Sequence, residues 1–395
     1  MFNWKSTRSV IMLFNSTQRP SYEALETPCL VVNKPILVRN LTSMRQNIES
    51  LGVKLRPHFK TLRSLEAAPH ILPNKTAPIT VSTLKEAEVL ADEGYRNIIY
   101  AVGISVTKLA RVHRLMSQGI RISVLLDSLT QAESLNEFCS RHQCSISALV
   151  EIDCDGHRAG VRPDDPLLLH IAQQLHTGDA HFQGVLTHAG EAYHCRNSYS
   201  LRRAASAEVK AALDAAQHLR SINIPCDIVS VGSTPTAHSY HDLAGITEVR
   251  AGVYGVFDLV MHRMGLCDID DIAISVVTTV IGHNVERGWL IIDAGWMALS
   301  SDRGIASQTS ECGFGLITDG AGTLFKDLRV SIVNQEHGII ETEGRDGIDF
   351  EAFPIGSRLH VLPNHACATT AMHTHYHVFD AQKATYEVWT RILGW

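Results

Sequence analysis

Three short segments of the chain carry residue types whose chemistry and spacing suit catalysis. Lys60 lies in RPHFKT, two turns rich in glycine and hydroxyl groups lie in VGSTPT and RAGVYG, and His365 and Cys367 lie in LPNHACATT. A lysine can form a Schiff base with a carbonyl compound. Small-residue turns can present backbone N–H groups to a phosphate. An imidazole and a thiolate suit a borderline-soft divalent cation such as Zn2+.

Lys60 and the two turns together suggest a bound cofactor. Lys60 ends the first strand predicted below, and the turns end the seventh and eighth strands, where phosphate sites of α/β barrels commonly lie. A lysine at the barrel mouth, opposite a phosphate site, suggests pyridoxal phosphate, which supplies an electron sink. Taken singly, Lys60 also fits a solvated strand end, and GSTP also fits an ordinary turn. Their combination favours the cofactor.

His365 and Cys367 form an H-x-C pair. On extended backbone, side chains two residues apart point to the same side, so this pair predicts two ligands of one divalent cation of the Zn2+ or Mn2+ type. Two protein ligands leave coordination positions open, as a catalytic metal requires. A buried cysteine beside a hydrogen-bonded histidine is the alternative. The nearby histidines at positions 373, 375 and 377 fit alternating polar positions on an exposed strand.

Other polar residues also follow predicted strands. The ends of the fifth and sixth strands carry Asp153, His157, Arg158, Thr187, His188 and Tyr193. The carboxyl ends of the strands of such a barrel carry its active site. We therefore expect these side chains around the same mouth as Lys60.

The elements that must hold these residues alternate regularly. β-branched runs predict strands at 53–58, 79–82, 97–102, 121–126, 148–153, 182–187, 227–231 and 248–252. Apolar spacings of three and four predict helices at 35–51, 84–93, 107–118, 129–141, 166–176 and 201–220. Eight such units predict an α/β fold, a (β/α)8 TIM-type barrel over residues 33–268. A doubly wound sheet is the competitor, but no nucleotide-binding fingerprint supports it.

The pattern changes after Asp268. Runs at 272–281, 289–292, 330–334, 338–343 and 358–363 predict strands separated by Gly and Asp turns. We expect a second, mostly β domain over residues 269–395, joined by 21–32, whose strand at 29–32 precedes the first barrel helix. Residues 1–20 predict a poorly ordered extension. Their apolar run is too short for a secretory signal, and Met12 is a plausible initiator.

Composition excludes several classes of protein. The chain has 395 residues, of which 45% are hydrophobic and 19% charged, so it can bury a large core. A net charge of −6 with dispersed cations argues against nucleic-acid and anionic-membrane binding. Membrane helices need about 18 consecutive apolar residues, and no run approaches that length. Nine cysteines without a CxxC pair predict a reduced, cytoplasmic protein.

Together these blocks resemble a known family. TPCLVV, RPHFKT, TVSTLKEAE, EIDCDGHRAGV, VLTHAGEAYH, VSVGSTPTA, EVRAGVYGVFDLVM, IIDAGWMALSSDRG, NQEHG and LPNHACAT resemble the D-serine dehydratase/D-threonine aldolase family. These are fold-type III pyridoxal phosphate enzymes with an alanine-racemase-like barrel. The likeness runs from about residue 25 to 395. It implies a homodimer with the active sites near the interface.

The resemblance also implies roles for individual residues. Lys60 would form the Schiff base, and His365 and Cys367 would bind a divalent metal. Arg158 would approach the phenolic oxygen of the cofactor, and Tyr193 would lie near its ring. The remaining candidates for cofactor binding, most of them around the phosphate, are Thr187, Ser233, Thr234, Gly252 and Tyr254. The sequence departs from the family pattern at Phe59, Leu62 and Gly255, which would reshape the substrate pocket.

The implied activity is β-elimination of water from a small D-3-hydroxy amino acid, D-threo-3-hydroxyaspartate or D-serine. The product is a 2-oxo acid with ammonia. Lys60 would remove the α-proton, and the metal would act as a Lewis acid on the leaving hydroxyl. The alternative is retro-aldol cleavage of the D-threonine aldolase type, with His188 or His157 as base. Two other functions are disfavoured. An alanine racemase needs no metal, and a non-catalytic carrier of the cofactor lacks the β domain.

Overall fold

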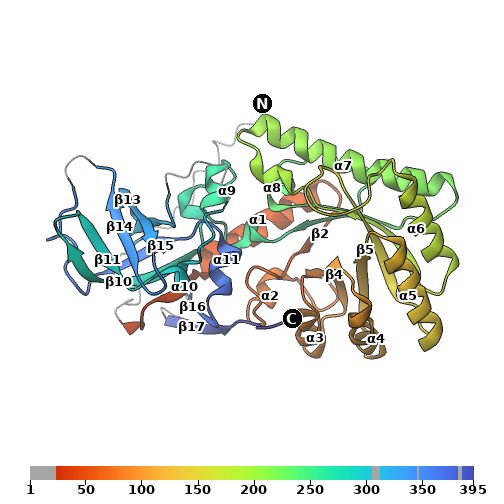
Figure 1. Cartoon of the computed structure of the whole chain (residues 1–395), viewed down its shortest axis with the longest axis horizontal. Helices are drawn as coiled ribbons and strands as arrows, with labels where there is room; N and C mark the ends of the chain where they lie inside the picture. The colour runs from red at the N-terminus through yellow and green to blue at the C-terminus, as the bar shows by residue number, and fades with distance from the viewer. Residues whose placement is uncertain (1–23, 305–311, 345–346, 381–384) are drawn as a thin grey trace.

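The computed structural model describes residues 24–304, 312–344, 347–380 and 385–395. The predicted extension at 1–20 lies outside them. The molecule is elongated, with a helix-covered barrel at one end and a β-rich part at the other (Figure 1). None of the helices in the described ranges is long and apolar enough to cross a membrane.

The barrel contains eight parallel strands in the order β2-β9-β8-β7-β6-β5-β4-β3. Their bounds are β2 Lys54–Pro57, β3 Pro78–Val81, β4 Asn97–Gly103, β5 Arg121–Leu126, β6 Ser147–Ile152, β7 His181–Thr187, β8 Ile228–Val231 and β9 Glu248–Ala251. Between β2 and β3 the ladder reduces to one bridge, His58 with Thr80, so the barrel is nearly closed. The predicted (β/α)8 barrel is confirmed.

Helices cover the outside of the barrel. The long ones are α1 Lys34–Ser50, α3 Leu84–Asp92, α4 Leu109–Ser117, α5 Leu129–His142, α6 Pro166–Thr177 and α7 Ser198–Ser221. Local sequence explains their starts: Asn33 caps α1, and Thr83 with Glu86 forms a capping box on α3. Three shorter helices, α2 Ala68–Ile71, α8 Thr234–Ala237 and α9 Leu259–Arg263, were not among the predicted elements.

The β-rich part is built on a second, nine-stranded sheet. Its strands are β1 Cys29–Asn33, β10 Ile274–Asn284, β11 Trp289–Ile292, β12 Leu316–Thr318, β13 Leu324–Val333, β14 Gly338–Thr342, β15 Arg358–Leu362, β16 His375–Asp380 and β17 Thr385–Thr390. Because β10 pairs with both β11 and β15, six of these strands close an antiparallel barrel. β1 pairs with β10 and β16, so the strand before the first barrel helix belongs to this sheet. The expectation of a mostly β C-terminal part is confirmed.

The H-x-C segment does not have the predicted extended backbone. Strand β15 ends at Leu362, and helix α11 spans Ala366–Ala371, so Cys367 lies in a first helical turn and His365 is its N-cap. The strand stops because the carbonyls of Pro363 and Asn364 accept hydrogen bonds from the start of α9 rather than from a neighbouring strand. His365 and Cys367 therefore meet across a helix start.

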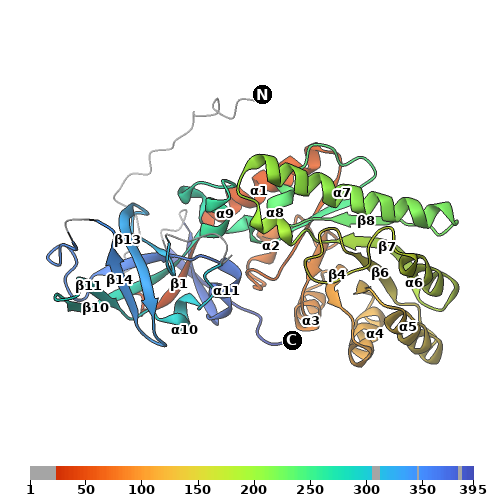
Figure 2. The ribbon, with the colours of Figure 1, turned by 45° about the horizontal axis from the view of Figure 1, so that its top comes forward.

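The C-terminal part also holds the loop that carries Lys60. Thr370 Oγ1 donates to the carbonyl of Thr61, and Tyr376 Oη donates to that of Leu62. The backbone N–H of Ile392 donates to the carbonyl of Arg63. The chain end then runs back to the barrel near α3 and α4 (Figures 1 and 2). Lys60 is thus positioned by both halves of the molecule.

Candidate active site

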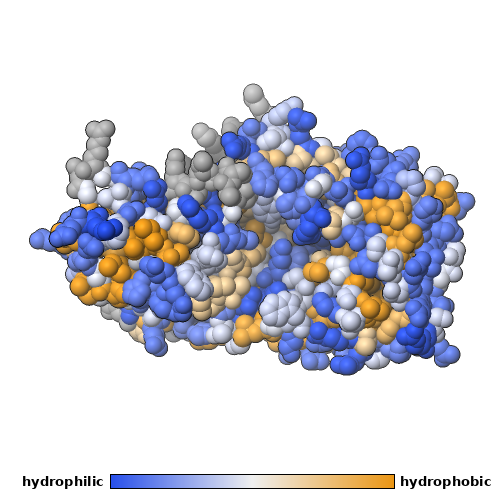
Figure 3. Space-filling model, in the orientation of Figure 1, coloured by the Kyte–Doolittle hydropathy of each residue, from blue (hydrophilic) through white to orange (hydrophobic). Residues whose placement is uncertain are grey.

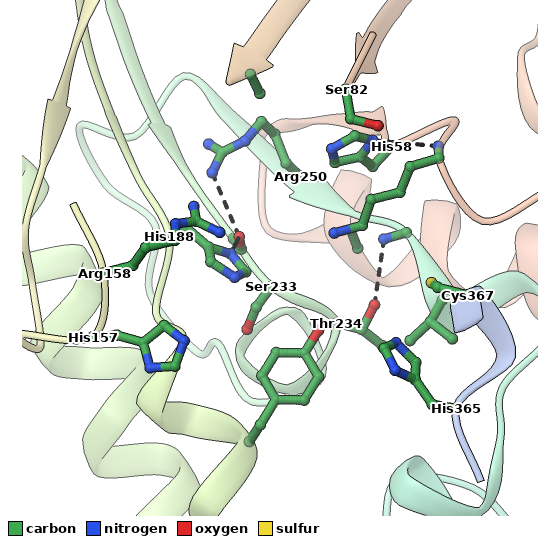
Figure 4. Close-up of a pocket in the computed structure, with 18 of the residues that line it drawn as sticks. His58, Ser82, His157, Arg158, His188, Ser233, Thr234, Arg250, His365 and Cys367 are labelled. Atoms are coloured by element: carbon green, nitrogen blue, oxygen red, sulfur yellow. Dashed lines mark hydrogen bonds between the residues drawn. The ribbon is translucent and has the colours of Figure 1, made fainter. Parts of the chain in front are cut away.

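A cavity of about 510 Å³ lies at the carboxyl ends of the barrel strands, facing the C-terminal part. Eight of the ten predicted site residues line it: Lys60, Arg158, Tyr193, Ser233, Thr234, Gly252, His365 and Cys367. His157 and Arg158 lie on one side of it, His365 and Cys367 on the other, and Ser233 and Thr234 between them (Figure 4). The face in Figure 3 is mostly hydrophilic, with separate apolar areas over the two ends of the molecule.

Lys60 is exposed to this cavity and is oriented through its backbone. Its N–H points to Nδ1 of His58 at 3.4 Å. Burial holds the pKa of His58 well below its usual value, and the cations Lys60 and Arg250 lower it further. His58 is therefore a neutral hydrogen-bond acceptor at Nδ1, which leaves its proton on Nε2.

The two turns predicted to bind phosphate lie side by side. The N–H of Gly252 donates to Thr234 Oγ1 at 3.3 Å. Ser233 caps the short helix α8 through a box with Thr236. A Cβ on Gly232, whose φ is +137°, would lie 2.0 Å from the carbonyl oxygen of Arg250, so only glycine allows this close approach. The turns form a small, donor-rich wall that fits a phosphate.

Glu208 on α7, which sequence reasoning missed, supports this wall from behind. Its side chain is fully buried. One carboxylate oxygen accepts the N–H groups of Ala189 and Gly232 at 3.1 and 2.9 Å, and the other accepts Tyr240 Oη at 2.5 Å. Burial raises the pKa of Glu208, and the hydrogen bond from Tyr240 opposes that shift. Glu208 thereby joins the loops after β7 and β8.

Arg250, also missed, is a residue of β9 whose side chain lines the cavity. It is 4% exposed, and burial lowers its pKa. Its guanidinium donates to Ser230 Oγ at 2.7 Å and to the carbonyl oxygens of Thr187 and Gly232. The side chain of Thr187 is buried and does not line the cavity, so its contribution is the carbonyl that orients Arg250.

Tyr193 and His188 are partly buried, neutral groups in the cavity wall. Burial raises the pKa of Tyr193, which also forms a hydrogen bond with the backbone of Thr234. Burial and Lys60 together lower the pKa of His188 to about 3. His188 Nδ1 lies 3.1 Å from the carbonyl of Gly232 and must donate to it, so the lone pair is on Nε2. With so low a pKa, His188 is a poor general base.

Tyr254 and the three departures from the family pattern lie outside this cavity. Tyr254, Phe59, Leu62 and Gly255 line a separate, small hollow against α1. A Cβ on Gly255 would lie 3.0 Å from Cδ2 of Leu41, so packing of α1 explains the glycine. The expectation that Phe59, Leu62 and Gly255 reshape the substrate pocket is wrong, because these residues line the separate hollow and not the cavity.

The H-x-C pair has the donor chemistry of a cation site. Burial raises the pKa of Cys367, but hydrogen bonding to His365 and the charge of Lys60 outweigh it and lower the pKa overall. Burial alone would lower the pKa of His365, yet bonds to Asp302 and Cys367 raise it to about 11. The described residues contain no cluster of three or more His, Cys, Asp or Glu placed for a metal. The imidazole and the thiolate alone would supply two ligands to a divalent cation and leave its other coordination positions open.

The other histidines near the C-terminus do not join this pair. His375 and His377 lie on strand β16, with their rings 5.3 Å apart, and neither lines the cavity. The Nε2 of His373 lies 2.9 Å from the carbonyl of Ala298. The expectation that an exposed strand explains the histidines is therefore confirmed for His375 and His377.

Comparisons with known proteins cover nearly the whole chain. Residues 32–260 match the family model of the alanine racemase N-terminal domain, and residues 273–379 match that of the putative serine dehydratase domain. The D-threo-3-hydroxyaspartate dehydratase of Delftia sp. is 42% identical over 94% of this chain and 98% of that protein. Its solved structure gives a TM-score of 0.92 and covers 95% of this chain and all of that one.

Two further relatives agree with this assignment. The D-serine dehydratase of Dictyostelium discoideum is 31% identical over 90% of this chain and 94% of that protein. An alanine racemase-like protein of Idiomarina loihiensis is 47% identical, with a TM-score of 0.92 over 95% of this chain and all of that one. A further similar structure is a cysteine-to-alanine variant of a D-threo-3-hydroxyaspartate dehydratase in the metal-free form. The chain therefore belongs to the D-serine dehydratase-like family, which joins an alanine-racemase-like barrel to a serine dehydratase domain.

Proposed function

We propose that the protein is a pyridoxal phosphate- and divalent-metal-dependent dehydratase of D-3-hydroxy amino acids. It would convert D-threo-3-hydroxyaspartate or D-serine into a 2-oxo acid and ammonia. One observation carries the proposal: Thr61, next to Lys60 in the chain, has its Oγ1 3.2 Å from Cys367 Sγ. The candidate lysine and the candidate cation pair therefore serve the same cavity.

The two curated relatives named above support dehydration over retro-aldol cleavage. The Delftia and Dictyostelium proteins are both dehydratases. In solved structures of a D-threo-3-hydroxyaspartate dehydratase, a histidine and a cysteine two residues apart have each been replaced by alanine, and the structure of the cysteine variant is in the metal-free form. His365 and Cys367 have the same spacing and lie together in the cavity. The pair is therefore our candidate for the metal site of this chain.

The cofactor would lie between Lys60 and the two turns. Ser233, Thr234 and Gly252 would hold its phosphate, while Tyr193 and Arg158 would contact the ring system. When bound, pyridoxal phosphate supplies an electron sink at Cα, and the divalent cation supplies a Lewis acid beside the leaving hydroxyl. His58 orients the backbone of Lys60, and Arg250 is fixed in the wall by its carbonyl and hydroxyl acceptors.

Lys60 Nζ is the group that would take the α-proton. A single base can take a proton from only one face of Cα, so the use of Lys60 would make the reaction stereospecific, as selection of D-substrates requires. His188 does not compete for this proton, because its pKa of about 3 makes it too weak a base. His365 and Cys367 would hold the cation on the side of the 3-hydroxyl, away from Arg158 (Figure 4).

Product analysis tests this proposal directly. The purified protein, supplied with cofactor and Zn2+ or Mn2+, is incubated with D-serine, D-threonine or D-threo-3-hydroxyaspartate. We expect a 2-oxo acid and ammonia in equal amounts, with L-serine unreactive and the Lys60→Ala variant inactive. Glycine with an aldehyde as the main product would overturn dehydration in favour of an aldolase.

A further inference from the structure

Asp302, a residue of the SSDRG segment that sequence reasoning did not single out, touches the candidate metal ligand. We propose that Asp302 is a positioning residue, which fixes the imidazole of His365 so that its Nε2 can bind the cation. The inference rests on the proposed function and adds a residue to its metal site.

The contact is short and the carboxylate is itself held. Asp302 Oδ2 lies 2.7 Å from His365 Nδ1. Asp302 Oδ1 accepts the N–H of Gly304 at 2.7 Å, and the N–H of Asp302 donates to Ser300 Oγ at 3.0 Å. The turn thus fixes one carboxylate oxygen and leaves the other for the imidazole.

This arrangement determines which ring nitrogen faces a cation. A carboxylate can only accept, so Nδ1 of His365 must carry the proton and donate it to Asp302. When a cation takes the place of the second ring proton, the nitrogen left to bind it is therefore Nε2. Histidines that bind metals commonly donate their other N–H to a carboxylate, which sets the ring orientation and raises its basicity. His365 and Asp302 both line the cavity that holds Cys367.

A second carboxylate fixes the backbone of the same segment but not the ring. Asp258 Oδ2 accepts the N–H of Ala366 at 2.9 Å, and its Oδ1 caps α9. Asp302 is therefore the residue that controls the imidazole itself. A contribution to folding stability does not explain why Asp302 and His365 are paired. Their side chains are 39% and 41% exposed, and ion pairs of that exposure add little to the stability of a protein.

The test measures metal affinity rather than turnover. The protein, freed of metal but with pyridoxal phosphate still bound, competes for Zn2+ with a chromogenic chelator. In Asp302→Asn we expect affinity to fall by roughly 10- to 100-fold, the usual effect of losing such a partner, with the melting temperature of the metal-free form unchanged. His365→Ala should lose far more. Asp214→Asn, which breaks a surface pair with Lys210, is the matched control and should bind Zn2+ as the wild type does.

The outcomes separate this inference from the proposed function. Unchanged affinity in Asp302→Asn, together with a large loss in His365→Ala, would overturn the positioning role and leave the metal site standing. A loss in Asp302→Asn as large as that in His365→Ala would also overturn it, because Asp302 would then be a direct ligand. If both variants bind Zn2+ as tightly as the wild type does, the metal site of the proposed function fails instead.

Discussion

Thr61 Oγ1 and Cys367 Sγ, 306 positions apart in the chain, lie 3.2 Å from each other. The same Thr61 accepts a hydrogen bond at its carbonyl from Thr370 Oγ1, at 2.8 Å. The loop after the first barrel strand and the first turns of α11 are therefore one unit. Any movement of the C-terminal part relative to the barrel would move the cation pair relative to Lys60, so the domain contact is part of the site.

Thr61→Val tests this coupling, because valine keeps the shape and removes the hydroxyl. We expect lower dehydratase turnover with the cofactor still bound, and a loss of stability of about 1 kcal/mol, typical of one hydrogen bond. Thr370→Val removes a hydroxyl that donates to the backbone carbonyls of Thr61 and Cys367 but makes no hydrogen bond to the Cys367 thiol. In Thr370→Val the stability should fall by a similar amount, and the Zn2+ affinity should be unchanged. Equal Zn2+ affinity and equal turnover in the two variants would contradict a special role for the Thr61–Cys367 contact.

Lys60→Ala should abolish both turnover and the visible absorbance of lysine-bound pyridoxal phosphate. The reason is that alanine has no amine to bond the cofactor or to take the α-proton. Borohydride reduction of the wild-type protein, followed by peptide mass analysis, should find the cofactor on the peptide that contains Lys60. A labelled peptide from elsewhere in the chain, with the absorbance intact in Lys60→Ala, would refute the assignment.

The barrel was predictable because each of its strands carries a local pattern. The run at 121–126 coincides with β5, and the predicted strand at 248–252 differs from β9 by one residue. Strand β12 has only three residues, Leu316–Thr318, and exists because it pairs with β13 and β15. Short elements fixed by distant partners leave little trace in the local sequence, whereas α8 was missed although Ser233 and Thr236 form a local capping box on it.

The residues of the candidate site were likewise predictable only in part. Lys60 and the two turns stand at strand ends, where the barrel pattern already predicts function. Glu208 lies in the middle of an ordinary amphipathic helix, and only its buried contacts with the loops after β7 and β8 reveal its role. Asp302 comes close to His365 through the folding of the β-rich part, across 63 positions of chain. No spacing rule connects such residues before the fold is known.

Gly232→Ala should release the cofactor. Its Cβ would lie 2.0 Å from the carbonyl oxygen of Arg250, so the phosphate turn must move away from β9. Gly119→Ala is the matched control, because Gly119 also has a positive φ, +79°, but has open space around it. We expect a fall of at least roughly tenfold in cofactor affinity for Gly232→Ala, a change of about 1.4 kcal/mol. Gly119→Ala should bind the cofactor normally and lose only about 1 kcal/mol of stability. Equal cofactor affinity in both variants would refute the role of the turn.

Glu208→Leu should weaken cofactor binding from behind the cavity wall. It leaves the N–H groups of Ala189 and Gly232 buried without their acceptor, at about 1–3 kcal/mol each. Glu208→Gln retains one oxygen as acceptor for both N–H groups and should recover most of the affinity. Titration of the two apoproteins with pyridoxal phosphate measures the difference. If the Gln and Leu variants bind the cofactor equally well, the carboxylate does not organise the two loops.

Acid should destabilise the protein before its carboxylates are neutralised, because the fold holds several histidines in the neutral form. Burial lowers the pKa of His238 to about 4 and that of His360 to about 4. In the unfolded chain these groups titrate near the ordinary value of 6.5, so below that pH the unfolded state binds more protons. Their stabilising effect is complete above about pH 6.5 and is lost as the pH falls toward 4. For His238 alone the loss is on the order of 3 kcal/mol at pH 4.

Melting temperatures measured between pH 4 and 8 should show this fall, and it should be less steep in His238→Leu, whose position lies against Phe257 and outside the cavity. An equally steep fall in that variant would show that His238 is not a source of the acid sensitivity.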